Sequence, residues 1–202
     1  MSNLWMQSRS GIPIPIEHPN PKLIRMDEVA HSLAGQPRYL AHTTKDHYSV
    51  AEHCVRVSYL LADWGEDEHM QMRGLIHDCP EAILGDITAP VKAVIRKHTH
   101  ALDVIEDRWL YAFLDFVGLT HMRSNPPMPL ALWERTQRTI KRADLVLLAT
   151  ERRDLMAPCD RDWNLTHEPL PKKLPHPLTS DRAERAFLDR FEELQAKRRM
   201  AA

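Results

Sequence analysis

Two clusters of proline limit where this chain can form regular structure. Four prolines lie between residues 13 and 21, and five more lie between residues 158 and 177. Proline fixes φ and lacks an N–H group, so both stretches favour extended backbone. Between them, apolar residues recur at the spacing of one helix face, and no alternating run predicts a sheet. The sequence therefore predicts an all-α fold, a bundle of about six to eight helices with an extended proline-rich N-terminal arm.

The expected organisation has three parts. Residues 1–25 form the arm, residues 26–157 form the helical domain, and residues 158–202 form a proline-rich segment and a C-terminal helix packed on the same domain. Four apolar side chains are expected to attach the arm to the body: Trp5, Ile12, Ile14 and Ile16. Helices are expected over 27–33 (capped by Asp27), 66–78, 91–97, 102–117 and 130–156, with others beginning at Ser49, at Pro80 and after Ser180, and a loop over 120–129.

Composition narrows the class of protein. The chain has 202 residues, 43% of them hydrophobic, which suits one globular domain. The formal net charge of −1, without blocks of like charge, argues against a dedicated nucleic-acid binder. The three cysteines form no CxxC pair and are expected to be buried free thiols. Without an apolar leader or a long apolar run, we expect a cytoplasmic protein with no membrane association.

Four separated residues have side chains that suit one divalent cation. They are His53, His77, Asp78 and Asp144, and all lie in segments expected to be helical. Mixed nitrogen and oxygen ligands leave coordination positions open for water, as a metal hydrolase requires. Each residue also has a simpler explanation. A His-Asp pair is common by chance, and Asp144 could instead pair with Lys141 or lie on the solvated flank of its helix.

The sequence around these residues resembles a known family. The stretch from His77 to Lys92 reads HDCPEAILGDITAPVK, and it is accompanied by Arg38-Tyr39, by YSVAEH ending at His53, by Ala143-Asp144 and by ATERRD over 149–154. These segments resemble the HD-domain phosphohydrolases, closest to the bacterial 5′-deoxynucleotidase branch and the related phage deoxynucleoside triphosphohydrolases. The resemblance covers roughly residues 25–157. It implies an HD-domain helical bundle in which His53, His77, Asp78 and Asp144 hold a single divalent ion, whether Co, Mn, Zn, Mg or Fe.

The resemblance also implies catalytic roles for two further carboxylates. Glu81 and Asp86 would line the catalytic pocket, with Glu81 moving a proton and Asp86 orienting water or the ribose. The alternatives are structural. Glu81 follows Pro80 at a helix start, where the helix dipole favours negative charge, and Asp86 follows Gly85 in a turn.

Substrate contacts are expected from Arg38, Tyr39 and Lys92. A guanidinium binds phosphate in a bidentate manner, so Arg38 is the main candidate, and Lys92 is a second one. Tyr39 stands where the nucleotidases carry a tryptophan that is implicated in choosing deoxyribose. His98 and His100 could approach a longer phosphate chain, or could simply face solvent at a helix end.

Together these features predict a metal-dependent nucleotide phosphohydrolase. The first expectation is 5′-dephosphorylation of deoxynucleoside monophosphates. The alternatives are a dNTP triphosphohydrolase that releases triphosphate and a non-catalytic nucleotide-binding module. The expected partners are a nucleotide and further copies of the chain, because the apolar faces over 102–117 and 183–194 suit a homo-oligomer.

Overall fold

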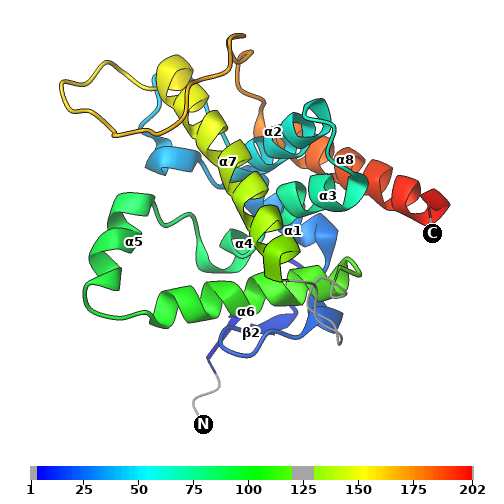
Figure 1. Cartoon of the computed structure of the whole chain (residues 1–202). Coiled ribbons are helices and arrows are strands. Elements are labelled where there is room, and N and C mark those ends of the chain that lie inside the picture. Colours follow the sequence, from blue (N-terminus) through cyan, green and yellow to red (C-terminus); the bar gives the residue numbers. More distant parts are fainter. Residues whose placement is uncertain (1–3, 120–129, 202) are drawn as a thin grey trace.

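The computed structural model describes residues 4–119 and 130–201, and these are mostly helical (Figure 1). A small antiparallel hairpin comes first, with β1 at Trp5–Gln7 paired to β2 at Pro13–Pro15. The α-helices are α1 Met26–Gly35, α2 Val50–Asp63, α3 Glu68–Ile76, α4 Glu81–Leu84, α5 Ala89–Arg96, α6 Ala101–Phe116, α7 Leu130–Leu155 and α8 Ser180–Ala201. Two 3₁₀ turns, η1 Pro21–Leu23 and η2 Arg38–Ala41, precede and follow α1. The all-α prediction is confirmed.

The N-terminal arm is extended as expected, but its attachment differs in detail. Ile14 is buried, and Met6 packs against the same core. Trp5 does not attach the arm, since 53% of it is exposed. Ile16 contributes through its backbone, because its carbonyl accepts a hydrogen bond from the indole Nε1 of Trp109 at 2.9 Å. The arm is therefore held by a backbone hydrogen bond as well as by buried side chains.

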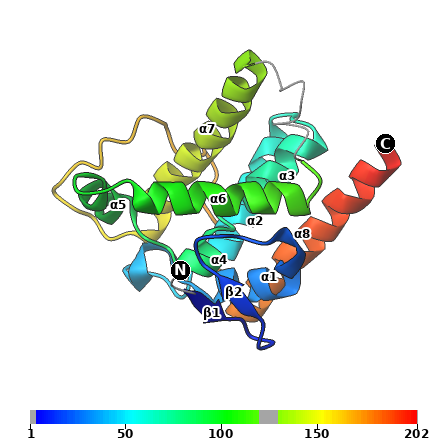
Figure 2. The same ribbon diagram turned by 90° about the horizontal axis from the view of Figure 1, so that it is seen from below.

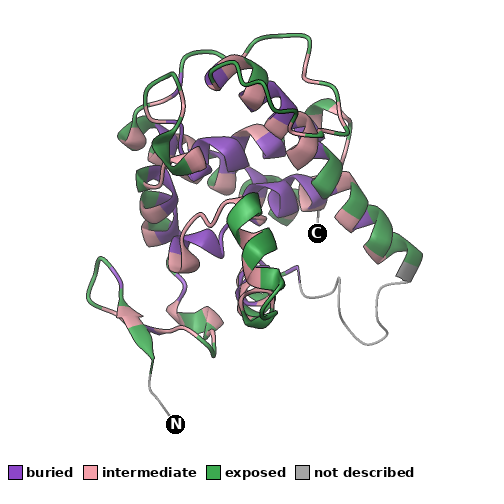
Figure 3. Cartoon of the chain, turned by 90° about the vertical axis from the view of Figure 1, so that its left-hand side faces the viewer, coloured by how far each residue is buried: buried purple, intermediate pink, exposed green. Residues whose placement is uncertain are grey.

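Helix α2 is the central element of the fold. It packs against α1, α3, α7 and α8 (Figure 2). Its N-terminus forms as the sequence predicts, because the Ser49 hydroxyl accepts a hydrogen bond from the Glu52 N–H at 3.2 Å. Buried positions gather in the middle of the molecule, whereas the hairpin is mostly intermediate or exposed (Figure 3). A helix surrounded by neighbours can bury polar side chains, and His53 on α2 is fully buried.

Some helix boundaries differ from the expected ones. Helix α1 begins at Met26 with Arg25 at its N-cap, so Asp27 is a first-turn residue and not the cap. Helix α3 ends at Ile76, two residues earlier than predicted, which leaves His77 at its C-cap. Asp78 then lies in the turn that leads to α4. Both side chains therefore lie off a helix end, where neighbours in sequence can reach one point.

The predicted apolar faces of α6 and α8 are covered within the chain itself. Trp109 and Phe113 of α6 share the main core with Ala183 and Phe187 of α8. These faces consequently give no support for a homo-oligomer, and the assembly state stays a prediction. In the part of the chain that the structure describes, no helix is long and apolar enough to cross a membrane.

The second proline-rich stretch, residues 157–179, is irregular but fixed to α7. The Leu170 N–H donates to the Thr150 hydroxyl at 2.9 Å, and the Leu174 N–H donates to Asp154 Oδ2 at 2.8 Å. Arg153 adds a hydrogen bond to the Leu170 carbonyl. We call residues 157–179 the strap. The loop predicted over 120–129 lies outside the described residues.

Candidate metal centre

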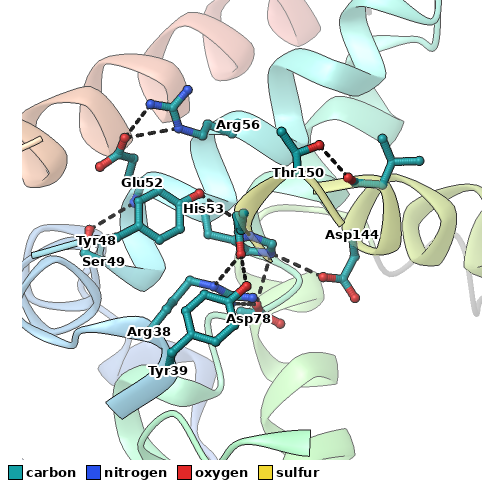
Figure 4. Close-up of polar contacts among 12 residues, drawn as sticks. Arg38, Tyr39, Tyr48, Ser49, Glu52, His53, Arg56, Asp78, Asp144 and Thr150 are labelled. Atoms are coloured by element: carbon teal, nitrogen blue, oxygen red, sulfur yellow. Dashed lines mark hydrogen bonds and ion pairs between the residues drawn. The ribbon is translucent and has the colours of Figure 1, made fainter. Parts of the chain in front are cut away.

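Three helices bring the four predicted ligands together. His53 comes from α2, His77 and Asp78 from the end of α3, and Asp144 from the middle of α7 (Figure 4 shows three of them). His53 Nε2 lies 3.4 Å from Asp144 Oδ1 and 3.7 Å from Asp78 Oδ2. His77 Nε2 lies 3.1 Å from the same Asp78 oxygen. Ligand atoms of His53, His77 and Asp144 all lie within 4.8 Å of one another, so these residues could hold one metal ion.

The hydrogen bonds of the two imidazoles favour metal binding through Nε2. His53 Nδ1 lies 2.6 Å from Glu151 Oε1, and His77 Nδ1 lies 2.8 Å from the Gly74 carbonyl oxygen. Both partners are acceptors, so each Nδ1 carries a proton and each Nε2 is the nitrogen that faces the carboxylates. Burial lowers the pKa of both imidazoles, but Glu151 and Asp144 raise that of His53 to about 9, and Asp78 raises that of His77. Among the described residues neither Nε2 has a hydrogen-bond partner, and both atoms are buried. A divalent cation between the two rings would displace the Nε2 protons and bind both nitrogens.

The carboxylates complete a donor set that suits a divalent cation. Burial opposes ionisation of Asp78, but His77 and His53 nevertheless hold its pKa below the ordinary value. Burial likewise opposes the charge on Asp144, and His53 again lowers the pKa of this carboxyl group. Two ionised carboxylates facing two imidazole nitrogens give the mixed hard and borderline ligands that Mn²⁺, Co²⁺, Zn²⁺ or Fe²⁺ accept.

The geometry of Asp144 is compatible with both explanations that the sequence left open, an ion pair with Lys141 and a metal ligand. Its Oδ1 faces His53, while its Oδ2 accepts a hydrogen bond from Lys141 Nζ at 2.7 Å. The Lys141 side chain is 65% exposed, so this ion pair lies at the rim and leaves the inner oxygen available. The ion pair and the ligand role are therefore compatible.

Glu151, one turn before the end of α7, is the residue that sequence reasoning missed. Its side chain is fully buried and accepts hydrogen bonds from Tyr39, Tyr48 and His53, at 2.5, 2.7 and 2.6 Å. Arg38 Nε adds an ion pair at 3.3 Å. Burial alone would raise the pKa of Glu151, but Arg38 and His53 lower it to about 2. Glu151 shares the stripe of α7 that carries Asp144, and this spacing was the available signal.

Arg38 and Tyr39, the predicted substrate contacts, lie beside the candidate ligands (Figure 4). Arg38 Nη1 is 3.5 Å from Asp78 Oδ2, and its side chain is only 12% exposed. The backbone that presents them is unusual, because Tyr39, Leu40 and Ala41 have φ of 57°, 52° and 62°. Consecutive non-glycine residues in the left-handed region are strained, and such strain gathers at functional sites.

Glu81 and Asp86 form an acidic edge of the centre. Burial, followed by the charges of Asp78 and Asp86, raises the pKa of Glu81 to about 9. Burial also raises the pKa of Asp86, whose N–H donates to Gln36 Oε1 at 3.0 Å. A carboxyl group that stays protonated near neutral pH can donate a proton, which is the property expected of a general acid.

Lys92 reaches the same edge but is already paired. Its Nζ lies 2.8 Å from Glu106 Oε1 and 3.8 Å from Glu81 Oε1. Lys92 would have to leave or share Glu106 in order to bind a substrate phosphate. His100 pairs with Asp103 at 3.1 Å and is 77% exposed at its side chain, in line with a helix-end histidine that faces solvent.

The cysteines differ from the expectation in two respects. Cys159 is exposed, whereas Cys54 and Cys79 are buried free thiols as predicted. Cys54 lies within 4.8 Å of ligand atoms of His77 and Asp78, although its spacing in the sequence suggested no ligand pattern. Burial raises the pKa of the Cys54 thiol to about 12, so in the metal-free protein it is a neutral neighbour of the centre.

Comparison with known proteins places the chain in a family without naming an activity. No family model matches it. It is 36% identical over 149 residues to the uncharacterized protein RCAP_rcc00048 of Rhodobacter capsulatus. The matched region covers 72% of this chain and 70% of that protein. The chain belongs to the RCAP_rcc00048 family. It is also 29% identical over 185 residues to the uncharacterized protein YfdR of Escherichia coli, across 88% of each chain.

Proposed function

We propose that this protein is an HD-domain metal-dependent phosphohydrolase that removes the 5′-phosphate from deoxynucleoside monophosphates. The observation that carries the proposal is the pair of buried, unpartnered Nε2 atoms of His53 and His77, which face Asp78 and Asp144. Their order along the chain, H…HD…D, is the pattern on which the resemblance to HD-domain enzymes rests. A closed structural metal site would instead be expected to use cysteine and histidine ligands only.

The residues around the ligands supply the remaining chemistry. The metal ion, held by His53, His77, Asp78 and Asp144, would lower the pKa of a coordinated water and polarise a phosphoryl oxygen. Arg38 would bind the phosphate and offset the charge that grows on its oxygens during attack. Glu81, with its raised pKa, would deliver a proton to the leaving 5′-oxygen, and Asp86 would orient the water or the sugar.

The cations available near the centre favour a monophosphate substrate. Arg38, the main candidate clamp, is already paired with Glu151 and Asp78, and Lys92 is paired with Glu106. A triphosphate carries more negative charge and would need several unpaired cations along a groove. The dNTP triphosphohydrolase remains the second candidate, because it uses the same metal ligands.

Product analysis separates the candidates. The protein is loaded with Mn²⁺, Co²⁺, Zn²⁺ or Mg²⁺ and given dAMP or dATP at equal concentration. We expect orthophosphate from dAMP, and no turnover by the Asp78→Ala variant. Release of intact tripolyphosphate from dATP, with dAMP untouched under every metal, would replace this proposal by the triphosphohydrolase. Tight nucleotide binding without any release would indicate the non-catalytic module.

A further inference from the structure

The strap carries one aromatic side chain to the neighbourhood of the metal centre. Trp163 lies half-buried with its ring centroid 6.1 Å from that of Tyr39, at an interplanar angle of 52°. The guanidinium of Arg152 lies over the indole, 5.7 Å from its centroid. Figure 1 shows how the strap leaves α7 and loops out before it returns toward α8. Residues far apart in the sequence thus form one aromatic edge.

This aromatic edge is connected directly to the metal ligands. The Tyr39 hydroxyl donates to Glu151, and Glu151 in turn accepts from His53 Nδ1. Arg38, the candidate phosphate clamp, lies under the same Tyr39 ring at 5.5 Å from its centroid. Trp163 is therefore one side chain further from the metal position than Tyr39 is. A nucleotide has its phosphate at one end and its base at the other. The side chain that contacts the base must therefore lie some distance from the phosphate site, as Trp163 does.

The placement of Trp163 is built into the fold. Hydrogen bonds from Leu170 and Leu174 fix the strap to α7 beyond Trp163, and Asn164 beside it has a φ of 52°. Because the two rings are tilted, Tyr39 does not cover the face of the indole. Indole faces and guanidinium groups both stack on nucleobases, and stacking tolerates any base because every base has a π-face.

We propose that Trp163 is a substrate-binding residue whose indole stacks on the nucleobase of the nucleotide, with Arg152 supporting the ring from behind. This inference rests on the proposed nucleotide phosphohydrolase and adds to it the element that distinguishes a nucleotide from other phosphate esters. It assigns base contact to the strap and phosphate contact to Arg38. Stacking supplies affinity for the base as a class and little discrimination among bases.

The test compares a substrate that has a base with one that lacks it. Wild type, Trp163→Ala and Trp163→Phe are loaded with Mn²⁺ or Co²⁺ and assayed on dAMP and on deoxyribose 5-phosphate. We expect Trp163→Ala to lower kcat/KM for dAMP roughly 10- to 100-fold, mainly through KM, because the stacking contact with the base is lost. Turnover of deoxyribose 5-phosphate should stay within about twofold, and Trp163→Phe should recover most of the loss.

A matched control is available at the C-cap of α2. Trp64 also packs under an arginine, with Arg142 at 4.6 Å from its ring centroid, but it packs against an apolar cluster that includes Leu60 and Leu61 and not against Tyr39. Trp64→Ala should leave the ratio of the two kcat/KM values unchanged. An equal loss on both substrates in Trp163→Ala would mean a structural role and would overturn the inference, as would no loss on either.

Equilibrium binding keeps this inference separate from the proposed reaction. Binding of dAMP to the metal-loaded protein is measured by calorimetry, whether or not phosphate is released. Weaker binding by Trp163→Ala than by Trp64→Ala supports the stacking role even if hydrolysis is absent. If wild type neither binds dAMP nor hydrolyses it, both the inference and the proposed function fail.

Discussion

His53 Nδ1 donates a hydrogen bond to Glu151 Oε1 over 2.6 Å, although the two residues are 98 positions apart in the chain. This bond joins α2 to the end of α7 and sets the imidazole tautomer. Because Glu151 also accepts from Tyr39 and Tyr48, its orientation is fixed from three sides. The geometry of the candidate metal centre therefore depends on a residue that is not one of the four proposed ligands.

Removing the charge of Glu151 should weaken metal binding without removing a ligand. In Glu151→Gln we expect metal affinity to fall about 10- to 100-fold, because a neutral amide accepts the His53 Nδ1–H bond more weakly than a carboxylate and leaves the imidazole a poorer ligand. Competition with a chelator measures the affinity. Glu52→Gln is the control, since Glu52 is a buried carboxylate on α2 that pairs with Arg56. Equal affinity in both variants would show that Glu151 only stabilises the fold.

Replacing Asp78 should abolish both bound metal and turnover. Asp78→Ala deletes a carboxylate oxygen 3.1 Å from His77 Nε2, so the remaining ligands hold the ion less tightly. Elemental analysis of the purified variant gives the metal content. Asp103→Ala, which removes an ion-paired carboxylate on α6, should retain the wild-type content. Stoichiometric metal in Asp78→Ala would refute the ligand assignment.

Replacing Glu81 should separate catalysis from metal binding. Glu81→Ala should keep its metal and lose about 10²- to 10⁴-fold in turnover, the usual contribution of a positioned acid or base. The pKa of Glu81 is raised to about 9 in the metal-free protein. If Glu81 acts as a proton donor, wild-type turnover should fall at high pH, where the group loses its proton. Unchanged turnover in the variant would leave Glu81 as a helix-end charge.

Acid should destabilise the metal-free protein partly through Glu151. The folded-state pKa of this group is lowered from 4.5 to about 2, by Arg38 and His53 acting against burial. A lowered carboxyl pKa contributes stability that is complete above 4.5 and is lost as pH falls through 2. Denaturant unfolding with a chelator present, at a series of pH values, should show this loss. The Glu151→Gln variant should lose less stability than wild type over the same interval.

Local signals predicted most of the helices. The Ser49 cap, the apolar stripe of α2 and the stop at Gly65 could all be read from adjacent residues, and α2 forms as expected. The ends of α1 and α3 were displaced by one or two residues, because caps compete with tertiary contacts. The apolar faces of α6 and α8 could not be assigned a partner from periodicity, which shows that a face is buried but not what covers it.

Spacing along the chain predicted that His53, His77, Asp78 and Asp144 would share one site. The structure brings these side chains together in a group that could hold a metal ion. The positions of Glu151 and Trp163 beside His53 and Tyr39 could not be predicted, because these contacts join residues about a hundred positions apart. The pairing of Lys92 with Glu106 could not be predicted from the sequence either, since it depends on how α5 lies relative to α6.

The long separation between His53 and Glu151 has a consequence for how the chain is made. Synthesis proceeds from the N-terminus, so α2 exists long before α7 has been translated. During that interval the imidazole of His53 lacks the Glu151 carboxylate on its Nδ1 side, and α2 has only α1 and α3 to cover its faces. The nascent chain cannot assemble a competent centre until nearly three quarters of the sequence has emerged, so a ribosome-stalled product ending before α7 would be inert and exposed to proteases.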